Sequence, residues 1–358
     1  MIDVAESAIP RRRPVLRQLA ELPVAVETAR FIAALIVALL AFSVLLLLQS
    51  RNPIPTLRDM FSSTLGSTYG LSEVGVKMIP LLLCALAVAV PAWLGLVNVG
   101  GEGQLYFGAW LASWPALTFT HLPEIAMLPF MLVFGMIGGA LWALVPAVLR
   151  ARGLMNETIS TLLLNYVAIL FVQYFVFGPW KDPASANFPQ SREFPAAANL
   201  PTFGGTRLHA GIIIAVVAAA ILFFVWRRTR WGYEMRAVGG NWEAARRAGI
   251  PIATYTIVAL LVGGALAGIA GFGEVSAIQG RLTPTLSPGY GYIGFLVSWL
   301  AGHNPLTIIL MSFLLAVLTA GGDSLQINQN LPFASVNLLM ALTLFVVLAQ
   351  RSRRRAMA

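Results

Sequence analysis

The residues of this chain that could do chemistry are concentrated in a short polar string. Residues 98–104 read Asn-Val-Gly-Gly-Glu-Gly-Gln, which places the carboxylate of Glu102 between the amides of Asn98 and Gln104. These groups can hydrogen-bond a polar solute. Polar groups at membrane depth are costly and usually line a cavity or a path. The same spacing also fits a tight turn at a membrane surface with Glu102 hydrated, and the residues alone leave both interpretations open.

Further polar groups lie at the start of the apolar run that begins near residue 158. Asn156 and Glu157 fit a helix start, as an N-cap and as a charge that complements the positive helix end. Asn165 lies two turns deeper, where an amide inside hydrocarbon needs a partner. We therefore group Asn165 with the polar residues of the 98–104 string as candidates for a polar path.

A basic segment at residues 227–251 is the second candidate site. It holds six arginines and the string Glu-Ala-Ala-Arg-Arg-Ala-Gly, which begins at Glu243 and ends at Gly249. Asn241 can N-cap a helix of about two turns, which Gly249 and Pro251 can end. Because an isolated helix that short is marginal in water, it needs a partner, and docking to another subunit would supply one. An ordinary connecting loop that obeys the positive-inside rule fits equally well.

The chain has no sequence signature of an enzyme. A P-loop needs Gly-Lys-Ser/Thr, and neither lysine, Lys77 or Lys181, follows a glycine. The HExxH and GxSxG motifs are missing as well. The three histidines are far apart, and Cys84 is the single cysteine. We therefore expect no catalytic residue, no metal site and no cofactor.

The composition of the chain places these strings in a membrane. Of its 358 residues, 58% are hydrophobic and only 11% are charged, whereas soluble proteins carry about 25% charged residues. The net charge of +9 does not indicate nucleic-acid binding, because the arginines lie at the ends of apolar runs, where membrane topology explains them. The predicted fold class is an all-α polytopic membrane protein with about ten transmembrane helices.

Ten apolar segments can be marked along the chain. They are residues 31–48, 78–97, 105–119, 125–149, 158–177, 210–226, 252–272, 289–302, 306–320 and 331–349. Seven are long enough, or nearly so, to cross about 30 Å of hydrocarbon. The segments at 105–119, 289–302 and 306–320 are short, and half-helices or re-entrant pieces fit them as well as full crossings do.

Five segments precede residues 178–209 and five follow them, which predicts two halves inserted in opposite senses. Two Gly-x-x-x-Gly strings, Gly135 to Gly139 and Gly264 to Gly268, supply small faces for close helix packing. With ten crossings and the N-terminus inside, 17 of the 24 Lys and Arg residues fall on the cytoplasmic side. Both termini are therefore predicted to be cytoplasmic.

This topology gives three parts. They are a cytoplasmic N-terminal segment at 1–30, a transmembrane domain at 31–349 and a basic cytoplasmic tail at 350–358. Residues 49–77 and 178–209 form the outer loops, and 227–251 form a cytoplasmic loop.

The outer loop at 178–209 is rich in proline, so turns and extended pieces fit it better than a long helix. It could cover the pore or receive an external partner, and a passive cap fits equally well. Glu274, Gln279 and Arg281 follow the seventh apolar segment, where they fit either a salt-bridged rim or a substrate contact.

Together these strings resemble the permease subunits of bacterial ABC importers, in the group that serves branched-chain amino acids, simple sugars and nucleosides. Glu243-Ala244-Ala245-x-x-x-Gly249 looks like the first part of the importer EAA loop, and residues 98–104 are similar to the Asn-x-Gly-x-Glu-Gly-Gln string of this group. Residues 156–166 and 178–183 look like the nucleoside branch in particular. The resemblance extends from about residue 70 to residue 345.

The resemblance implies an importer of nucleosides, or alternatively of a simple sugar such as a pentose, in the bacterial inner membrane. A cytoplasmic ABC ATPase would grip the helix at 241–249, and a periplasmic or lipoprotein binding protein would deliver substrate. A second, related permease would complete a heterodimer. The residues implied in ATPase coupling are Asn241, Glu243, Ala244, Ala245, Arg246, Arg247 and Gly249. The candidates for the translocation path are Asn98, Glu102, Gln104 and Asn165.

Two rival classes of protein stay open. A secondary transporter would need a titratable or cation-binding group in mid-membrane, and Glu102, Glu157 and Glu274 all lie near segment ends. A membrane-embedded enzyme would need a cluster of acid, base or metal-ligating residues. Uptake that depends on ATP, and co-purification with an ATPase, would separate the importer from both.

Overall fold

The structure, a computed structural model, describes residues 23–332, 334–335, 337–343 and 345–346. Over these residues it is helical, and paired extended backbone is limited to two isolated bridges, Lys181–Ser191 and Thr202–His209. The predicted all-α class is confirmed. The chain divides into two compact units, Ile54–Val336 and a smaller unit of Met1–Pro53 with Asn337–Ala358. In the smaller unit the structure describes helix α2, Pro23–Leu48, and the helical residues 337–343 and 345–346.

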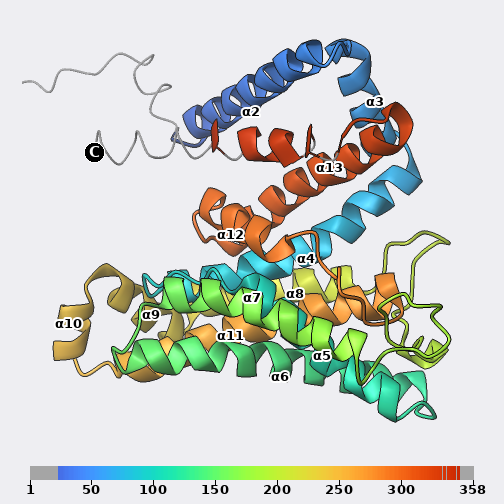
Figure 1. Ribbon diagram of the computed structural model, residues 1–358. Helices are drawn as coiled ribbons and strands as arrows, with labels where there is room; N and C mark the ends of the chain where they lie inside the picture. Colours follow the sequence, from blue (N-terminus) through green and yellow to red (C-terminus); the bar gives the residue numbers. More distant parts are fainter. Residues whose placement is uncertain (1–22, 333, 336, 344, 347–358) are drawn as a thin grey trace, which may run out of the picture. The chain divides into compact units, whose positions relative to one another are not determined.

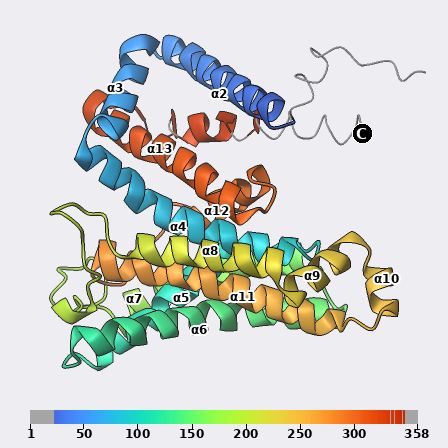
Figure 2. The ribbon, with the colours of Figure 1, turned by 180° about the vertical axis from the view of Figure 1, so that it is seen from behind.

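The remaining helices follow in chain order. They are α3 Pro53–Leu65, α4 Thr68–Ala92, α5 Gly101–Thr118, α6 Glu124–Ala151, α7 Glu157–Phe177, α8 Gly211–Arg228, α9 Arg230–Gly240, α10 Trp242–Arg247, α11 Ile252–Gly273, α12 Tyr290–Leu300 and α13 Pro305–Gln329. A π-helical turn, Glu274–Gln279, continues α11. Figures 1 and 2 show α5, α6, α7, α8 and α11 running alongside one another, with α9 and α10 at one end of this bundle and the 178–209 loop at the other.

Six helices of the described chain are long and apolar enough to cross a membrane. They are α4, α6, α7, α8, α11 with its π-helical turn, and α13. Ile32–Leu48 within α2 and Tyr290–Leu300 are shorter apolar helices. The segment predicted at 331–349 lies partly outside the described residues. Ten crossings and the inverted relation of two halves therefore stay predictions.

The three segments expected to be short differ in length. α12 has 11 residues and rises about 16 Å, roughly half of the hydrocarbon thickness, which is the length expected of a half-helix. The segment at 105–119 lies in α5, which begins at Gly101 and has 18 residues. The segment at 306–320 is not short, because α13 continues through polar residues to Gln329. In that extension Asp323 forms an ion pair with Lys77 of α4 at 3.0 Å. The segment at 49–77, predicted to be an outer loop, is mostly helical, since it holds α3 and the first turns of α4.

Close packing at glycines joins α6 to α11, as the two Gly-x-x-x-Gly strings predict. A Cβ atom on Gly139 would lie 2.0 Å from the Gly264 carbonyl oxygen, and one on Gly268 would lie 2.0 Å from the Gly135 carbonyl oxygen. Gly108 of α5 packs against the same contact, because a Cβ atom on Gly108 would lie 2.4 Å from the Gly268 Cα. Three backbones thus approach so closely that only glycine fits.

The 178–209 loop lacks a long helix, as its prolines predict, and holds only a short 3-10 turn at Ala196–Ala198. Its backbone bonds the chain just beyond α11: the N–H groups of Phe194 and Leu200 donate to the carbonyls of Gly280 and Ser276. His209 closes the loop in a buried position, where its Nδ1 accepts from the Gly211 N–H at 3.2 Å. Burial, and then the charge of Arg207, lower the pKa of His209 to about 4.

The glycine contact gives a first prediction. Gly268→Ala should lower the melting temperature of the detergent-solubilised protein by several degrees, because the added methyl group collides with the Gly135 carbonyl oxygen and the two backbones must separate. Gly240→Ala is the matched control, since a Cβ at Gly240 meets nothing within 4 Å. Equal melting temperatures for the two variants would show that α6 and α11 do not meet as described.

Candidate functional site

The connection between α4 and α5 is irregular backbone that lies against the first turns of α7. The Thr161 hydroxyl oxygen accepts from the Val99 N–H at 3.2 Å. Asn165, which is fully buried, accepts from the Gly103 N–H at 2.8 Å and donates to the Val99 carbonyl at 2.9 Å. The amide predicted to need a partner inside the membrane therefore has two, and both are backbone groups of the 98–104 string.

The two amides of the string bond each other. Asn98 and Gln104 exchange hydrogen bonds of 3.1 Å through both of their side-chain polar atoms. Asn98 also accepts from the Gly100 N–H at 3.0 Å and donates to the Ala87 carbonyl at 3.3 Å. Both side chains are almost completely buried. These bonds fix the turn between α4 and the first residues of α5.

Glu102 is buried as well, with 2% of its surface exposed, so the alternative of a hydrated surface turn is wrong. Its carboxylate accepts from the N–H of Gly291 at 2.7 Å, in the first turn of α12. A negative charge at a helix N-terminus is favourable because the first N–H groups of a helix have no intrahelical partner. The backbones are in close contact here, since a Cβ on Gly291 would lie 2.1 Å from the Glu102 nitrogen.

Glu157 connects this cluster to the end of α6. Asn156 caps α7 as predicted, by accepting from the Thr158 N–H at 2.8 Å. One oxygen of Glu157 accepts from the Val97 N–H at 3.2 Å, and the other pairs with Arg150 Nε at 2.9 Å. Glu157, Thr161 and Asn165 are four residues apart, which places them on one face of the helix.

The basic segment at 227–251 forms two helices. α10 is the short capped helix that the sequence predicts: the Asn241 side chain accepts from the Ala244 N–H at 3.0 Å, and Gly249 has a φ of +81°. Within α10 only Ala245 is buried, while Ala244, Arg246 and Arg247 are exposed. Glu243 lies within 3.5 Å of Arg246 and 3.3 Å of Arg247. The exposed side chains of α10 are therefore small or basic, apart from the aromatic Trp242.

The other helix of this segment, α9, connects α10 to the bundle. A Cβ on Gly239 would lie 2.3 Å from the Trp93 carbonyl oxygen, so the end of α9 packs against the end of α4. Glu234 bonds the Tyr255 hydroxyl of α11 and pairs with Arg230 at 2.6 Å. The hydrogen bond from Tyr255, and then the hydrogen bond and charge of Arg230, lower the pKa of Glu234. The sequence analysis missed α9, although Thr229 before its first turn is a typical N-cap.

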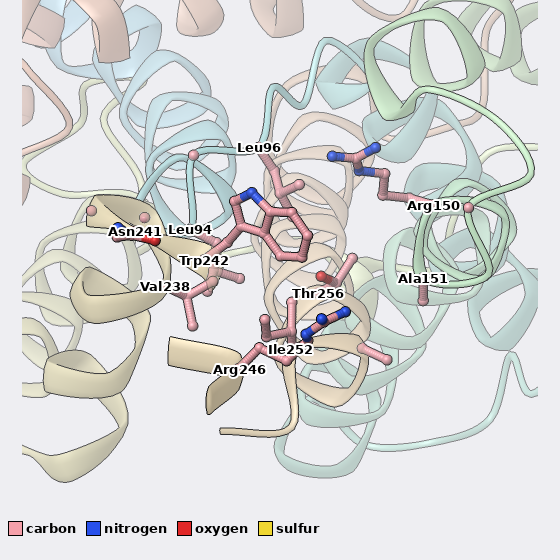
Figure 3. A pocket seen from close by; sticks show the side chains of 15 residues that line it. Leu94, Leu96, Arg150, Ala151, Val238, Asn241, Trp242, Arg246, Ile252 and Thr256 are labelled. Atoms are coloured by element: carbon pink, nitrogen blue, oxygen red, sulfur yellow. The ribbon is translucent and has the colours of Figure 1, made fainter. Parts of the chain in front are cut away.

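A cavity of about 680 Å³ lies beside α10, at the end of the bundle (Figure 3). Its walls come from the α4–α5 connection, the end of α6, α9, α10 and the first turns of α11. In Figure 3 the Trp242 indole lies near the middle of the view, with the guanidinium groups of Arg150 and Arg246 on either side. The sequence analysis did not find this cavity, because its residues come from five separate segments.

The residues predicted near the end of α11 separate into two environments. Arg281 forms an ion pair with Glu193 of the 178–209 loop at 3.2 Å, which fits a salt-bridged rim. Glu274 is buried in the π-helical turn and does not belong to that rim. Over the described residues, no three His, Cys, Asp or Glu side chains gather as a metal site would require.

The sequence family follows from comparison with known proteins. A profile of the family described as branched-chain amino acid transport system / permease component matches residues 70–349. This chain belongs to that family. It is therefore a multi-pass membrane permease of an ABC transporter, and it is not the ATPase.

The relatives of the permease include proteins named for the transport of glucose and of nucleosides. The glucose ABC transporter permease TsgB13 of Haloferax volcanii is 36% identical, over 90% of this chain and 88% of its own. The nucleoside ABC transporter permease NupB of Lactococcus lactis is 31% identical, over 88% of each chain. The putative glucose permease TsgC13, also of Haloferax volcanii, is 28% identical over 72% of this chain and 79% of its own.

The contact of Glu102 with α12 gives a second prediction. Glu102→Ala should reduce uptake by the permease at least tenfold while its abundance in the membrane falls less than twofold, because the lost carboxylate leaves the Gly291 N–H unpaired but keeps the helices packed. Glu124→Ala, at the first residue of α6, is the control and should leave uptake unchanged. Normal uptake by the Glu102 variant would make this carboxylate a purely structural group.

Proposed function

We propose that this permease imports nucleosides with the help of a separate ABC ATPase, and that α10 is the site where the ATPase docks. The observation that carries the proposal is the exposure of α10: a capped helix of six residues, isolated at one end of the bundle, with a single buried side chain. A helix that short gains little stability by itself. A cleft in a partner that covers Ala244, Ala248 and the nearby backbone would hold it in place.

The charges of α10 suit a partner with acidic residues around such a cleft. Arg246 and Arg247 are exposed, and Glu243 compensates only part of their charge. Charge pairs at the edge of an interface guide the partner's orientation more than they add to affinity. Motion imposed on α10 would reach the transmembrane helices through α9, which packs against Trp93 at the end of α4 and bonds Tyr255 of α11.

We assign the buried polar cluster a role beside the translocation path. Asn98 and Gln104 bond each other, and Asn98 also bonds the backbone of Gly100 and Ala87. Asn165 bonds the backbone of Gly103 and Val99, so these side chains hold the irregular segment in shape. Glu102 differs from them because it holds the start of α12, a half-helix that enters from the outer end of α11. A change in that contact would move α12 and open or close a path next to it.

The orientation that fits this mechanism places α10 in the cytoplasm and the 178–209 loop outside, with both termini inside. A binding protein would then deliver substrate on the side of that loop. A second, related permease would complete the translocation path, as the presence of both TsgB13 and TsgC13 in one organism suggests. The membrane would be the bacterial inner membrane.

The substrate we propose is a nucleoside, in line with the residues at 156–166 and 178–183 and with the relative NupB. A simple sugar is the second candidate, since TsgB13, a glucose permease, is 36% identical. Both substrates are neutral and rich in hydroxyl groups, so the same polar contacts would serve either.

Docking at α10 is tested by two substitutions. Gly249→Val should strain the left-handed turn that ends α10, and Glu243→Lys should reverse the charge in its first turn, so each should reduce both ATPase association and uptake at least tenfold. Gly153→Ala is the control for strain, because Gly153 also has a positive φ, of +69°, but lies in the α6–α7 turn. Association is measured by co-purification with the ATPase. Wild-type association and uptake in both α10 variants would make this segment an ordinary loop.

The substrate is tested by competition in whole cells. Uptake of labelled uridine should be abolished by a hundredfold excess of unlabelled nucleosides and should persist in a hundredfold excess of glucose or ribose. It should stop on ATP depletion and survive an uncoupler of the proton-motive force. Sugar uptake without nucleoside competition would reverse the substrate assignment, and sensitivity to the uncoupler alone would favour a secondary transporter.

A further inference from the structure

The cavity beside α10 carries charge of one sign. Its walls include two arginines, Arg150 and Arg246, and no Asp or Glu residue. The carboxylates that pair with these arginines, Glu157 and Glu243, belong to the surroundings and not to the walls. A cavity lined in this way attracts an anion.

An ion pair holds the Arg150 side chain in place at the cavity. Its Nε atom pairs with Glu157, and Glu157 is itself buried and fixed by the Val97 N–H. A guanidinium group has five N–H donors, and Nε supplies only one of them. The four N–H donors on the terminal nitrogens of Arg150 therefore remain for a ligand in the cavity.

Arg246 and Trp242 come from the same short helix. The Arg246 guanidinium lies 5.6 Å from the centre of the Trp242 ring, in a cation–π contact, and its distance of 3.5 Å to Glu243 is long for an ion pair with hydrogen bonding. Trp242 is 58% exposed, which is high for a tryptophan. Figure 3 shows its indole among the side chains that line the cavity.

We propose that this cavity binds a nucleoside monophosphate, with the phosphate on Arg150 and Arg246 and the base on the Trp242 indole. Guanidinium groups match the planar pairs of oxygen atoms of a phosphate, and an indole stacks on a planar ring. The volume of about 680 Å³ lies within the usual range for small-molecule sites. Inorganic phosphate, a sugar phosphate or a lipid headgroup would satisfy the arginines and leave the indole unused.

Because the cavity lies beside α10, a ligand bound there would regulate the docking helix. A phosphate shared by Arg150 of α6 and Arg246 of α10 would tie the docking helix to the bundle. This step rests on the proposed function, which places α10 in the cytoplasm, where phosphorylated nucleosides occur. Binding of the ligand would then make the importer respond to the concentration of nucleotides in the cytoplasm.

Binding of labelled AMP to the full-length permease in phosphatidylcholine nanodiscs tests the proposal. We expect saturable binding that Arg150→Gln and Arg246→Gln each weaken about tenfold or more, because each removes charge-assisted hydrogen bonds. The controls Arg152→Gln and Arg247→Gln carry the same change outside the cavity walls and should stay within about twofold of wild type. Since Arg246 is exposed, Arg246→Gln remains informative if Arg150→Gln unfolds the protein.

Ligand variants separate the two halves of the site. Adenosine should bind far more weakly than AMP, and Trp242→Leu should weaken AMP binding while leaving ribose 5-phosphate binding unchanged. Wild-type AMP binding by Arg246→Gln would overturn the proposal. The absence of AMP binding would also overturn it. Co-purified phosphatidylglycerol that the Arg150→Gln/Arg246→Gln variant loses would then show that the cavity holds a lipid. The measurement needs neither ATPase nor uptake, so its failure leaves the transport proposal standing.

Discussion

The contact between the glycine-bearing faces of α6 and α11 is the constraint on which the rest of the larger unit depends. In hydrocarbon there is no hydrophobic gain when two helices associate, so close packing of small residues must supply the attraction. The contacts at Gly139 and Gly268 leave no room for a side chain, which fixes the register of the two helices. α5 meets them at Gly108. This one packed interface therefore sets where α5 and α11 begin. Both candidate sites depend on these starting points.

The polar cluster around residues 98–104 solves a different problem. Irregular backbone at membrane depth has N–H and C=O groups that water does not reach, so other parts of the protein must bond them. α7 does so with Thr161 and Asn165, and Glu157 extends the same face to Val97. Satisfied polar networks in a low-dielectric interior are rigid. Glu102 is the member that connects this rigid part to a separate helix, α12.

The fold class, the small helix faces at the Gly-x-x-x-Gly strings and the capped helix α10 could be predicted because each depends on residues close in sequence. That the two glycine faces meet each other is seen only in the folded chain. A cap needs a residue such as Asn241 and the turn beside it, and a small face needs only a repeat of four. The burial of Glu102 could not be predicted, because Gly291, its partner, lies 189 residues away. The same holds for the cavity beside α10. The end of α13 was missed because Asp323 is polar, and its ion pair with Lys77 shows in the folded chain alone.

The buried imidazole of His209 makes the structure of the 178–209 loop responsive to acid. In the unfolded chain a histidine takes up a proton near pH 6.5, whereas the folded protein resists protonation down to a pKa of about 4. The stability that this difference contributes is complete above about pH 6.5 and is lost as the pH falls toward 4. The loop that bonds the residues beyond α11 is thus most stable near neutral pH, and an acidic medium would loosen it before it loosened the glycine-packed helices.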